Sequence, residues 1–345
     1  MSIYTIDPLS DDRWNDLVAR HPRATSFHER GWLKALARTY DYHPVVLTTN
    51  AEGEPLNNGI VFCRISSWVT GTRLVSLPFA DHCDPLLNGP DGSLEMMHWL
   101  RAECDRGRWR YVEFRPLPGE QDPNSDLHPA SSYCFHELDL KPTLDQIIDK
   151  LHKNSFRRKI KRAEKERLAY EVGNSELLVN EFYDLLLITR RRHQLLPQPI
   201  TWFKNLAECM PGKLQIRLAR KDGVSIAAML TLRHQSCVVY KYGCSDASRH
   251  NLGGMPFLFW NLVKESKTSG AEKIDLGRSD LNNEGLITFK NRLGATRKLL
   301  TYYRYPDDGM DNRLTWEFRG LRDVLFNLPN SVLSAAGRVL YKHVG

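Results

Sequence analysis

A run of cationic side chains is the feature of this chain best suited to binding a charged molecule. Phe156, Ile160 and Ala163 recur at helical spacing, which predicts a helix over 155–168 with these residues as its buried stripe. Four cations lie on both sides of this stripe, so some of them must face solvent or a cleft. They are Arg157, Arg158, Lys161 and Arg162. Guanidinium groups bind phosphate through paired hydrogen bonds, so this helix is typical of a phosphate site. A solvated helix face is the alternative.

A second group of reactive side chains lies in the first half of the chain. Asp81, His82, Cys83 and Asp84 are consecutive and follow a strand-like run. His82 or Asp84 could take a proton from an acceptor amine, as a general base does. A metal site is disfavoured, because adjacent residues cannot easily share one ion. The alternative is a polar loop in which Asp81 bonds to the backbone.

The charge is divided unevenly along the 345 residues. Residues 1–140 carry 13 Lys and Arg against 20 Asp and Glu, and residues 141–345 carry 35 against 21. The net charges of −7 and +14 indicate an anionic partner for the second half. No signal segment and no run of 18 apolar residues is seen, so we expect a cytoplasmic protein, with the inner face of the membrane as a second option. The seven scattered cysteines indicate buried free thiols in a reducing compartment.

The order of predicted elements repeats itself, which indicates an α/β chain with mixed sheets. A helix over 93–106 leads to the strand 110–114, and a helix over 256–269 leads to the strand 273–276. Three strand-like runs precede each helix, and in the second half they are 214–220, 225–233 and 237–243. We expect two copies of one unit rather than a single large sheet.

The predicted domains follow from this repeat. They are residues 1–140, residues 141–306 with the basic helix, and a C-terminal helical tail over 307–345. The tail contains two amphipathic stretches, 314–328 and 331–341. Docking on one of the domains is favoured over a peripheral membrane foot, because two basic residues attract anionic lipid only weakly.

Several short motifs give the chain a resemblance to a known superfamily. They are Leu77-Pro78-Phe79-Ala80-Asp81, Tyr240-Lys241-Tyr242-Gly243, Asp275-Leu276-Gly277 and the segment 285–294. With the element order of 214–305, they resemble the GNAT acyltransferases, and in particular the Fem-type aminoacyltransferases and related acetyltransferases of exopolysaccharide and cellulose synthesis. The resemblance covers about residues 10–310 and implies two tandem GNAT-like domains with a cleft between them. The stretch 174–199 is too short for the helical arm of Fem proteins, so the armless relatives are closer.

The resemblance also implies roles for individual residues. Lys290, which follows Phe289, matches a Phe-Lys motif whose lysine stabilises the reaction intermediate, and we expect Lys290→Ala to fold normally and lose most activity. Asp84 corresponds to an aspartate that contacts the acceptor. Tyr242 is a candidate proton donor to the leaving group; alternatively Tyr240 and Tyr242 share one face of a strand as packing residues.

Two further pairs complete the expected site. Asp275 and Arg278 end a strand beside the expected cleft and are candidate substrate contacts. Gly253 and Gly254 correspond to the glycines whose backbone N–H groups hold the pyrophosphate of CoA. Leu252 occupies the first glycine position of that motif, so the glycines are shifted by one. This departure leaves room for an aminoacyl-tRNA or carrier-bound donor in place of acyl-CoA, and no metal is expected.

We therefore expect an acyltransferase that moves an acetyl or aminoacyl group onto an amine or hydroxyl of a phosphate-bearing cell-envelope glycan, polysaccharide or lipid-linked precursor. A tRNA-dependent Fem-type aminoacyltransferase of peptidoglycan precursors is the first alternative. A nucleic-acid-binding protein without catalysis is the second, against which the chain carries no helix-turn-helix, zinc-finger or RNP signature.

Overall fold

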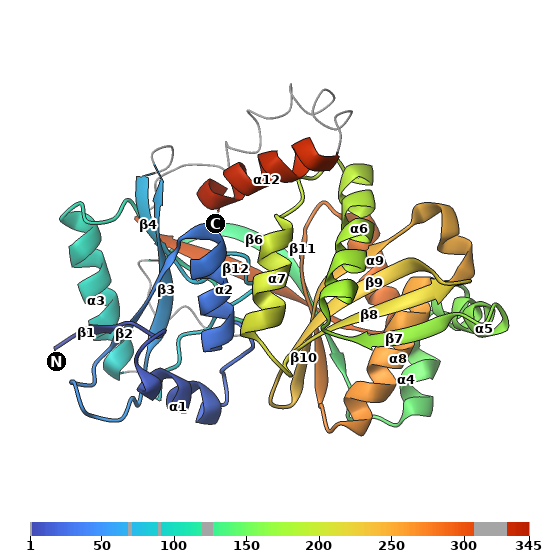
Figure 1. Ribbon diagram of the computed structural model, residues 1–345. Helices are drawn as coiled ribbons and strands as arrows, with labels where there is room; N and C mark the ends of the chain where they lie inside the picture. Colours follow the sequence, from blue (N-terminus) through green and yellow to red (C-terminus); the bar gives the residue numbers. More distant parts are fainter. Residues whose placement is uncertain (1, 68–70, 89–90, 119–126, 307–329, 345) are drawn as a thin grey trace. The chain divides into compact units, whose positions relative to one another are not determined.

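The computed structural model describes residues 2–67, 71–88, 91–118, 127–306 and 330–344 (Figure 1). The chain forms two compact units. Unit 1 takes in the described residues of Met1–Tyr133, Leu299–Gly320 and Arg338–Gly345, and unit 2 takes in those of Cys134–Lys298 and Leu321–Gly337.

Unit 1 is built mainly from short strands, with helices packed against them. Its elements are β1 (Tyr4–Ile6), α1 (Asp12–Arg20), α2 (Arg30–Tyr40), β2 (His43–Thr48), β3 (Ile60–Ser67), β4 (Gly71–Val75), α3 (Asp91–Asp105), β5 (Val112–Phe114) and most of β12 (Thr296–Tyr305). Neighbouring strands are antiparallel except for the parallel pair β4 and β5. Apolar residues of α3 and the sheet, among them Phe62, Leu74, Met96 and Leu100, form its core.

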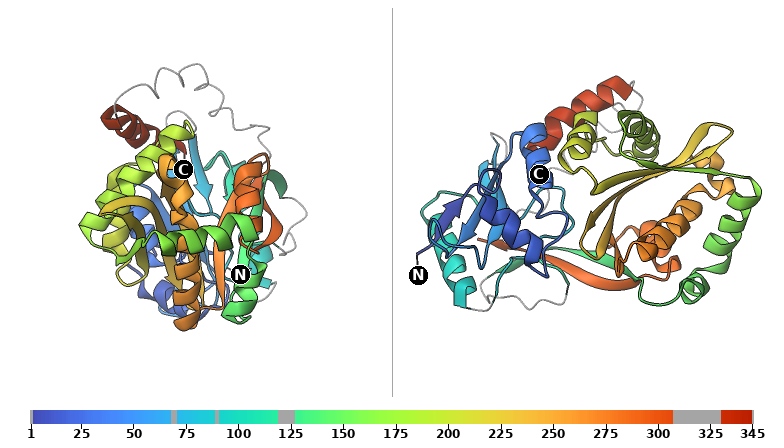
Figure 2. Two further views of the ribbon diagram at one scale, coloured as in Figure 1. Left: turned by 90° about the vertical axis from the view of Figure 1, so that its right-hand side faces the viewer. Right: turned by 60° about the horizontal axis from the view of Figure 1, so that its bottom comes forward.

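Unit 2 contains the longer elements. They are β6 (His128–Asp139, whose first residues belong to unit 1), α4 (Leu144–Lys150), η1 (Lys153–Arg157), α5 (Arg158–Lys165), β7 (Ala169–Gly173), α6 (Glu176–Arg192), α7 (Ile200–Cys209), β8 (Leu214–Lys221), β9 (Val224–His234), β10 (Cys237–Ser245), η2 (Ala247–Leu252), α8 (Gly254–Thr268), β11 (Lys273–Asp280) and α9 (Glu284–Arg292). Figure 2 shows α6 and α8 on opposite faces of the strands β8–β10.

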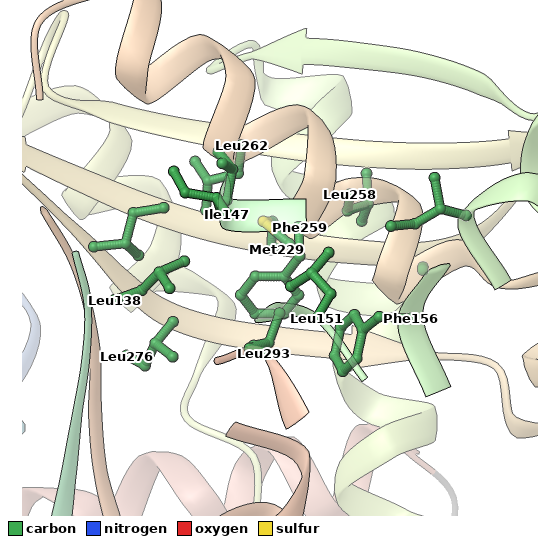
Figure 3. Close-up of a cluster of buried hydrophobic side chains, with 14 of the residues drawn as sticks. Leu138, Ile147, Leu151, Phe156, Met229, Leu258, Phe259, Leu262, Leu276 and Leu293 are labelled. Carbon is green, nitrogen blue, oxygen red and sulfur yellow. The ribbon is translucent and has the colours of Figure 1, made fainter. Parts of the chain in front are cut away.

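The core of unit 2 lies between α8 and the sheet. Leu258, Phe259 and Leu262 of α8 belong to one buried cluster with Met229 of β9 and Phe156 of η1 (Figure 3). Each of these residues is no more than 1% exposed. Because side chains alternate along a strand, the other face of β9 carries Ala228, Leu230 and Leu232 toward α6 and α7.

The strand order corrects one expectation. Within the described residues the strands form a twelve-stranded sheet in the order β1-β2-β3-β4-β5-β12-β6-β11-β10-β9-β8-β7, so the expectation that the chain does not form a single large sheet is wrong. The division into compact units remains, because β1–β5 and most of β12 belong to unit 1, and β7–β11 belong to unit 2.

Local signals in the sequence explain several element ends. Thr143 and Gln146 form the expected capping box at the start of α4. The predicted helix over 155–168 is two elements, because residues Lys153–Arg157 form one π-helical turn before α5 begins. The helix α7 was not expected, since Pro197 and Pro199 indicated a break; Pro199 instead precedes its first turn.

The C-terminal helix is α12 (Asn330–Val344), which confirms the second tail helix, whereas 314–328 lies outside the described residues. Leu333 is 2% exposed, and the hydroxyl of Tyr42 donates to the carbonyl of Tyr341 at 2.8 Å. Docking of this helix is therefore observed. Among the residues that the structure places, no helix combines the length and hydropathy needed to cross a bilayer.

Candidate functional site

A pocket of about 560 Å³ opens at the N-terminus of α8 in unit 2. Its walls come from η1 and α5, from η2 and the first turn of α8, and from α9. Ala227 of β9 and Ser245 at the end of β10 also line it. The polar and charged side chains in its lining are Ser155, Lys159, Ser245, Arg249, His250, Glu284, Thr288 and Arg292.

Two glycines let the backbone of this pocket pack closely. Gly253 is the N-cap of α8 and has φ +80°, in the left-handed region that favours glycine. A Cβ there would overlap the carbonyl oxygen of Lys159, and a Cβ on Gly254 would lie 2.9 Å from the side chain of Ala227. Gly253 is therefore needed both for its conformation and for the close approach of α5.

The first turn of α8 presents backbone donors to the pocket. The N–H groups of Gly254 and Met255 belong to the first turn, in which N–H groups have no partner within a helix. Pro256 follows and has no N–H. Partial positive charge at a helix N-terminus attracts anions. Gly254, expected from the sequence to bind cofactor, lines the pocket, and Gly253 shapes it.

The lining is cationic. Lys159, Arg249 and Arg292 oppose the single carboxylate Glu284, which leaves a net charge of +2 in the lining. Asp246 lies 3.8 Å from Arg249 and offsets part of this charge. The arrangement suits an anion that carries more than one negative charge.

The positive charge around the pocket affects the protonation of His250. Ser245 Oγ lies 2.8 Å from His250 Nε2, and Arg192 Nη1 donates to the same nitrogen at 3.4 Å. Since a guanidinium can only donate, Nε2 accepts and the imidazole is neutral. Burial, and then the charges of Arg192 and Lys159, hold the pKa of His250 below its ordinary value. His250 is thus a neutral side chain at the edge of a positive pocket.

A β-bulge in β10 decides where the tyrosines of this strand lie. Tyr240 pairs with Thr231 and Tyr242 with Leu230, so Lys241 is the extra residue. Tyr240 therefore packs on Phe259 of α8, and Tyr242 packs on Phe203 of α7. The expectation that both tyrosines share one face is wrong, because a bulge reverses the alternation that follows it.

Tyr242 lies outside the pocket. It is 9% exposed, its hydroxyl donates to Gln198 Oε1 at 2.6 Å, and it accepts from Trp202 Nε1 at 3.1 Å. These bonds fix the hydroxyl between β10, α7 and the segment before α7. Its assignment as a proton donor stays a prediction.

The ladder between β10 and β11 is short. Cys237–Val239 pair in parallel with Lys273–Asp275, and the register ends there although both strands continue. Asp275 Oδ1 accepts from the N–H of Gly277 at 2.6 Å, and Gly277 has φ +68°. Asp275 is 3% exposed, and its side chain stabilises the backbone conformation of its own strand. Arg278 is half-buried and lies three residues beyond Asp275, the last residue paired in this register.

Lys290 of α9 binds this part of β11. Its side chain is 2% exposed, and Nζ donates to the carbonyls of Gly277 and Arg278 at 3.0 Å each. Phe289 lines the pocket and packs against Phe156 in a tilted arrangement, with 5.3 Å between the ring centroids. The Phe-Lys pair therefore joins the pocket wall to the strand, and the catalytic role of Lys290 stays a prediction.

The cations singled out on the basic helix lie outside the pocket lining. Arg158, Lys161 and Arg162 are exposed, and Arg162 pairs with Glu166 at 2.6 Å. Arg157 donates to the carbonyl of Asp149 at 2.6 Å and to its carboxylate at 3.1 Å. The cation of this segment in the pocket lining is Lys159, which follows Ser155, also in the lining, by one turn.

The polar cluster of unit 1 is enclosed. Asp84 is 2% exposed; its Oδ1 accepts from Leu117 N–H at 2.5 Å and its Oδ2 lies 3.4 Å from Arg23 Nε. The carbonyl of Asp81 accepts from Tyr302 at 2.7 Å, and His82 packs on Phe27. Burial raises the pKa of the Cys83 thiol, so it is not a thiolate. These contacts of Asp81, His82 and Asp84 stabilise the conformation of the loop.

Sequence reasoning missed Lys159, Arg292 and His250. A helical spacing of four residues could have pointed to two of them. Lys159 lies one turn after Ser155, and Arg292 lies one turn after Thr288 on α9; all four residues line the pocket. No group of three or more metal-ligating side chains occurs among the described residues.

Comparisons with known proteins agree with this geometry. Residues 150–290 match the sequence model of a family described as "Acetyltransferase (GNAT) domain". No curated protein matches the chain by sequence. Among solved structures, FemX is similar with a TM-score of 0.68 at 12% identity, over 92% of this chain and 100% of FemX.

Two other structures have the same fold. A C-terminal domain from Agrobacterium fabrum, solved under the name of a lysylphosphatidylglycerol synthetase, has a TM-score of 0.55 at 17% identity, over 85% of this chain and 90% of that domain. A tandem GNAT protein from the clavulanic acid biosynthesis pathway has a TM-score of 0.54 at 11% identity, over 88% of this chain and 98% of its own.

The match over 150–290 places a GNAT acetyltransferase domain in unit 2, and the fold of the chain is that of tandem GNAT and Fem-like proteins. The chain therefore carries an acyltransferase domain of the GNAT type at residues 150–290.

Proposed function

We propose that the donor of this acyltransferase is an acyl-CoA, whose pyrophosphate binds at the N-terminus of α8. The observation that carries the proposal is the pocket in which Lys159, Arg249 and Arg292 surround the first turn of that helix. Cations and free backbone N–H groups directed at one hollow are suited to a diphosphate. The volume of about 560 Å³ falls within the range of small-molecule sites, about 300–1,000 Å³.

The reaction needs an anionic carbonyl oxygen to be stabilised and two substrates to be held in line. We assign to Lys290 the positioning of the Gly277 and Arg278 backbone, where β11 has left its ladder with β10. A thioester carbonyl beside this strand would lie close to fixed backbone dipoles. Asp84 and Tyr242 remain candidates for acceptor contact and proton donation, with Asp81, His82, Asp275 and Arg278 as candidate substrate contacts.

The acceptor in this proposal is an amine or hydroxyl of a phosphate-bearing cell-envelope precursor, met at the inner face of the membrane. The fold shared with FemX and with a protein named for making an aminoacylated phospholipid supports this choice. The charge of +14 over residues 141–345 supports a phosphate-bearing partner.

Aminoacyl-tRNA is the second candidate donor, and one feature favours it. Pro256 removes one N–H from the first turn of α8, and Leu252 stands at the first glycine position of the CoA motif. The cradle thus offers fewer backbone donors than a first turn without proline, so a donor bound mainly through side-chain cations also fits.

Ligand binding to the full chain separates these donors. Acetyl-CoA, CoA, bulk tRNA and duplex DNA are compared by thermal shift, where a ligand at a hundredfold excess over Kd stabilises by about 2.7 kcal/mol. Acetyl-CoA is expected to stabilise the protein. Stabilisation by tRNA alone supports the second candidate, and stabilisation by tRNA and DNA alike supports a nucleic-acid-binding protein.

Lys159→Gln tests whether the binding occurs in the pocket. We expect it to raise the Kd for acetyl-CoA at least tenfold, because one charge-assisted contact is worth about 1.5–3 kcal/mol. Lys161→Gln is the matched control, since Lys161 is exposed on the same helix and does not line the pocket. Equal Kd values for the two variants would contradict the proposed donor site.

A further inference from the structure

Unit 2 has a second hollow at the opposite end of α8. Its volume is about 290 Å³, and Glu265, Ser266 and Ser269 from the last turns of α8 line it. The first pocket is lined by Gly254, Met255 and Pro256 from the first turn. A helix of 15 residues rises about 22 Å, so the two pockets are separate sites.

The sheet face beneath α8 changes from apolar to polar at this end. Ala219, Ala227 and Met229 belong to the apolar core, as expected for strand positions facing a helix. The next positions on the same face, at a spacing of two, are the polar residues Arg217, Gln215, Thr231 and Arg233. Polar side chains thus replace the core within the same two strands, and they line the hollow.

Arg217 is fixed in the wall of this hollow. It is 4% exposed, and its guanidinium donates to Glu265 Oε2 at 3.1 and 3.2 Å, to Gln215 Oε1 at 2.7 Å and to Thr231 Oγ1. A buried ion pair is in itself a poor stabiliser, because desolvation offsets the attraction. A cation held rigidly beside a cavity does, however, favour an anion that enters the cavity, since the guanidinium is already in place.

The net charge of the lining side chains indicates the kind of ligand that this hollow can bind. Among the lining side chains, Lys213, Arg217 and Arg233 oppose Glu265, which leaves a net charge of +2. Arg233 also donates to the carbonyl of Ser269, so its charge is partly offset by the carbonyl end of α8. The hollow lies at the lower edge of the size range of small-molecule sites. We infer that this second pocket binds a small anion bearing phosphate or carboxylate groups, independently of the donor pocket.

Calorimetric titration of the full chain tests the site. Sodium phosphate and sodium citrate are the two probes, each at an ionic strength held constant with NaCl. The variant Lys213→Gln/Arg233→Gln is expected to raise the Kd of at least one probe tenfold or more. A response to phosphate alone identifies a phosphorylated ligand, and a response to citrate alone identifies a carboxylate.

Arg292→Gln in the first pocket is the matched control. It is expected to weaken acetyl-CoA and to leave second-site binding unchanged, whereas the double variant leaves acetyl-CoA unchanged. If Lys213→Gln/Arg233→Gln binds both probes like the wild type, or if Arg292→Gln alone abolishes their binding, the inference is overturned. Should the double variant not fold, Lys213→Gln decides, because Lys213 is exposed. Failure of acetyl-CoA to bind would affect the proposed donor and not this result.

Discussion

Charged side chains in the two units have opposite surroundings. In unit 1, Glu113 of β5 lies between Arg115 and Arg304, with N···O distances of 2.7 and 2.8 Å and side-chain exposures of 6, 11 and 15%. In unit 2, Lys159, Arg249 and Arg292 surround a hollow with one carboxylate among them. A closed network satisfies its own charges, and an open one leaves charge for a ligand. The burial of a cluster among groups of opposite charge, more than its residue types, therefore distinguishes a structural cluster from a binding cluster.

The largest expected effect tests the closed network. Glu113→Gln leaves two partly buried guanidiniums without a counter-charge, so we expect the free energy of unfolding to fall by about 3–5 kcal/mol. Urea denaturation measures it. Glu103→Gln is the control: its partners Arg106 and Arg108 are 72 and 56% exposed, and the loss should stay below about 1 kcal/mol. Similar losses in both variants would remove the contrast between closed and exposed pairs.

The same network predicts a pH dependence. Burial raises the pKa of Glu113, but Arg115 and Arg304 outweigh this and hold the pKa below its usual range. A depressed pKa in the folded state means that the stabilisation is complete above the unfolded value, about 4.3, and is lost as pH falls through the folded value. The stability difference between wild type and Glu113→Gln should therefore shrink in acid.

Gly253→Ala tests whether the pocket depends on close backbone packing. The left-handed φ and the overlap with Lys159 together should cost about 2–4 kcal/mol and weaken acetyl-CoA binding. Gly270→Ala is the matched control after the other end of α8, with φ +78° and no atom within 4 Å of a Cβ. It should cost only about 1–2 kcal/mol and leave acetyl-CoA binding unchanged. Equal effects on binding would mean that the approach of α5 is unimportant.

Lys290 sharpens the comparison, because it is enclosed although it belongs to unit 2. Lys290→Met removes the donor to Gly277 and Arg278 and should lower stability by about 1.5–3 kcal/mol. Lys267→Met is the control: its Nζ donates to the carbonyls of Leu140 and Lys141 from a half-buried position, and its loss should cost less. Normal stability with a large fall in kcat would instead favour the catalytic role expected from the sequence.

The smallest effect concerns His250. An anion in the pocket offsets the charges of Arg192 and Lys159, so the pKa of His250 should rise on binding of acetyl-CoA or phosphate. By linkage, affinity should increase as pH falls through the titration range, by a few-fold. NMR titration of the imidazole signals measures the shift. His193, whose pKa is also lowered by burial and Arg192 but which does not line the pocket, should respond less.

Much of the fold was readable from periodicity and local signals. The strands β8–β10, the helix α8 and the capping box at Thr143 follow from alternation, an amphipathic stripe and side-chain spacing. The twelve-stranded order was not readable, since it depends on pairings between distant segments. The bulge at Lys241 was also invisible, because an extra residue in a strand has no required side chain.

The site was predicted in part for a similar reason. Gly253 and Gly254 were singled out by their resemblance to the CoA motif, and the structure places them at the start of α8 beside the pocket, while their binding of a cofactor stays a prediction. The basic segment was recognised as a phosphate-binding candidate. Which of its cations reaches the pocket depends on how the helix is rotated, and that is set by Phe156 and Ile160 packing into the core. The enclosure of Asp84 depends on Arg23 and Leu117, which are distant in the sequence.

The strand β12 has a consequence for how the protein is made. Tyr303 and Arg304 pair with Phe114 and Glu113, and Leu300 and Tyr302 are at most 2% exposed in unit 1. A ribosome delivers these residues only after residues Cys134–Lys298 of unit 2 have been synthesised. Until β12 is synthesised, the amino-terminal part has an open ladder edge at β5, and Glu113 has only Arg115 as its ion-pair partner. Truncated chains should therefore be prone to aggregation and early recognition by chaperones.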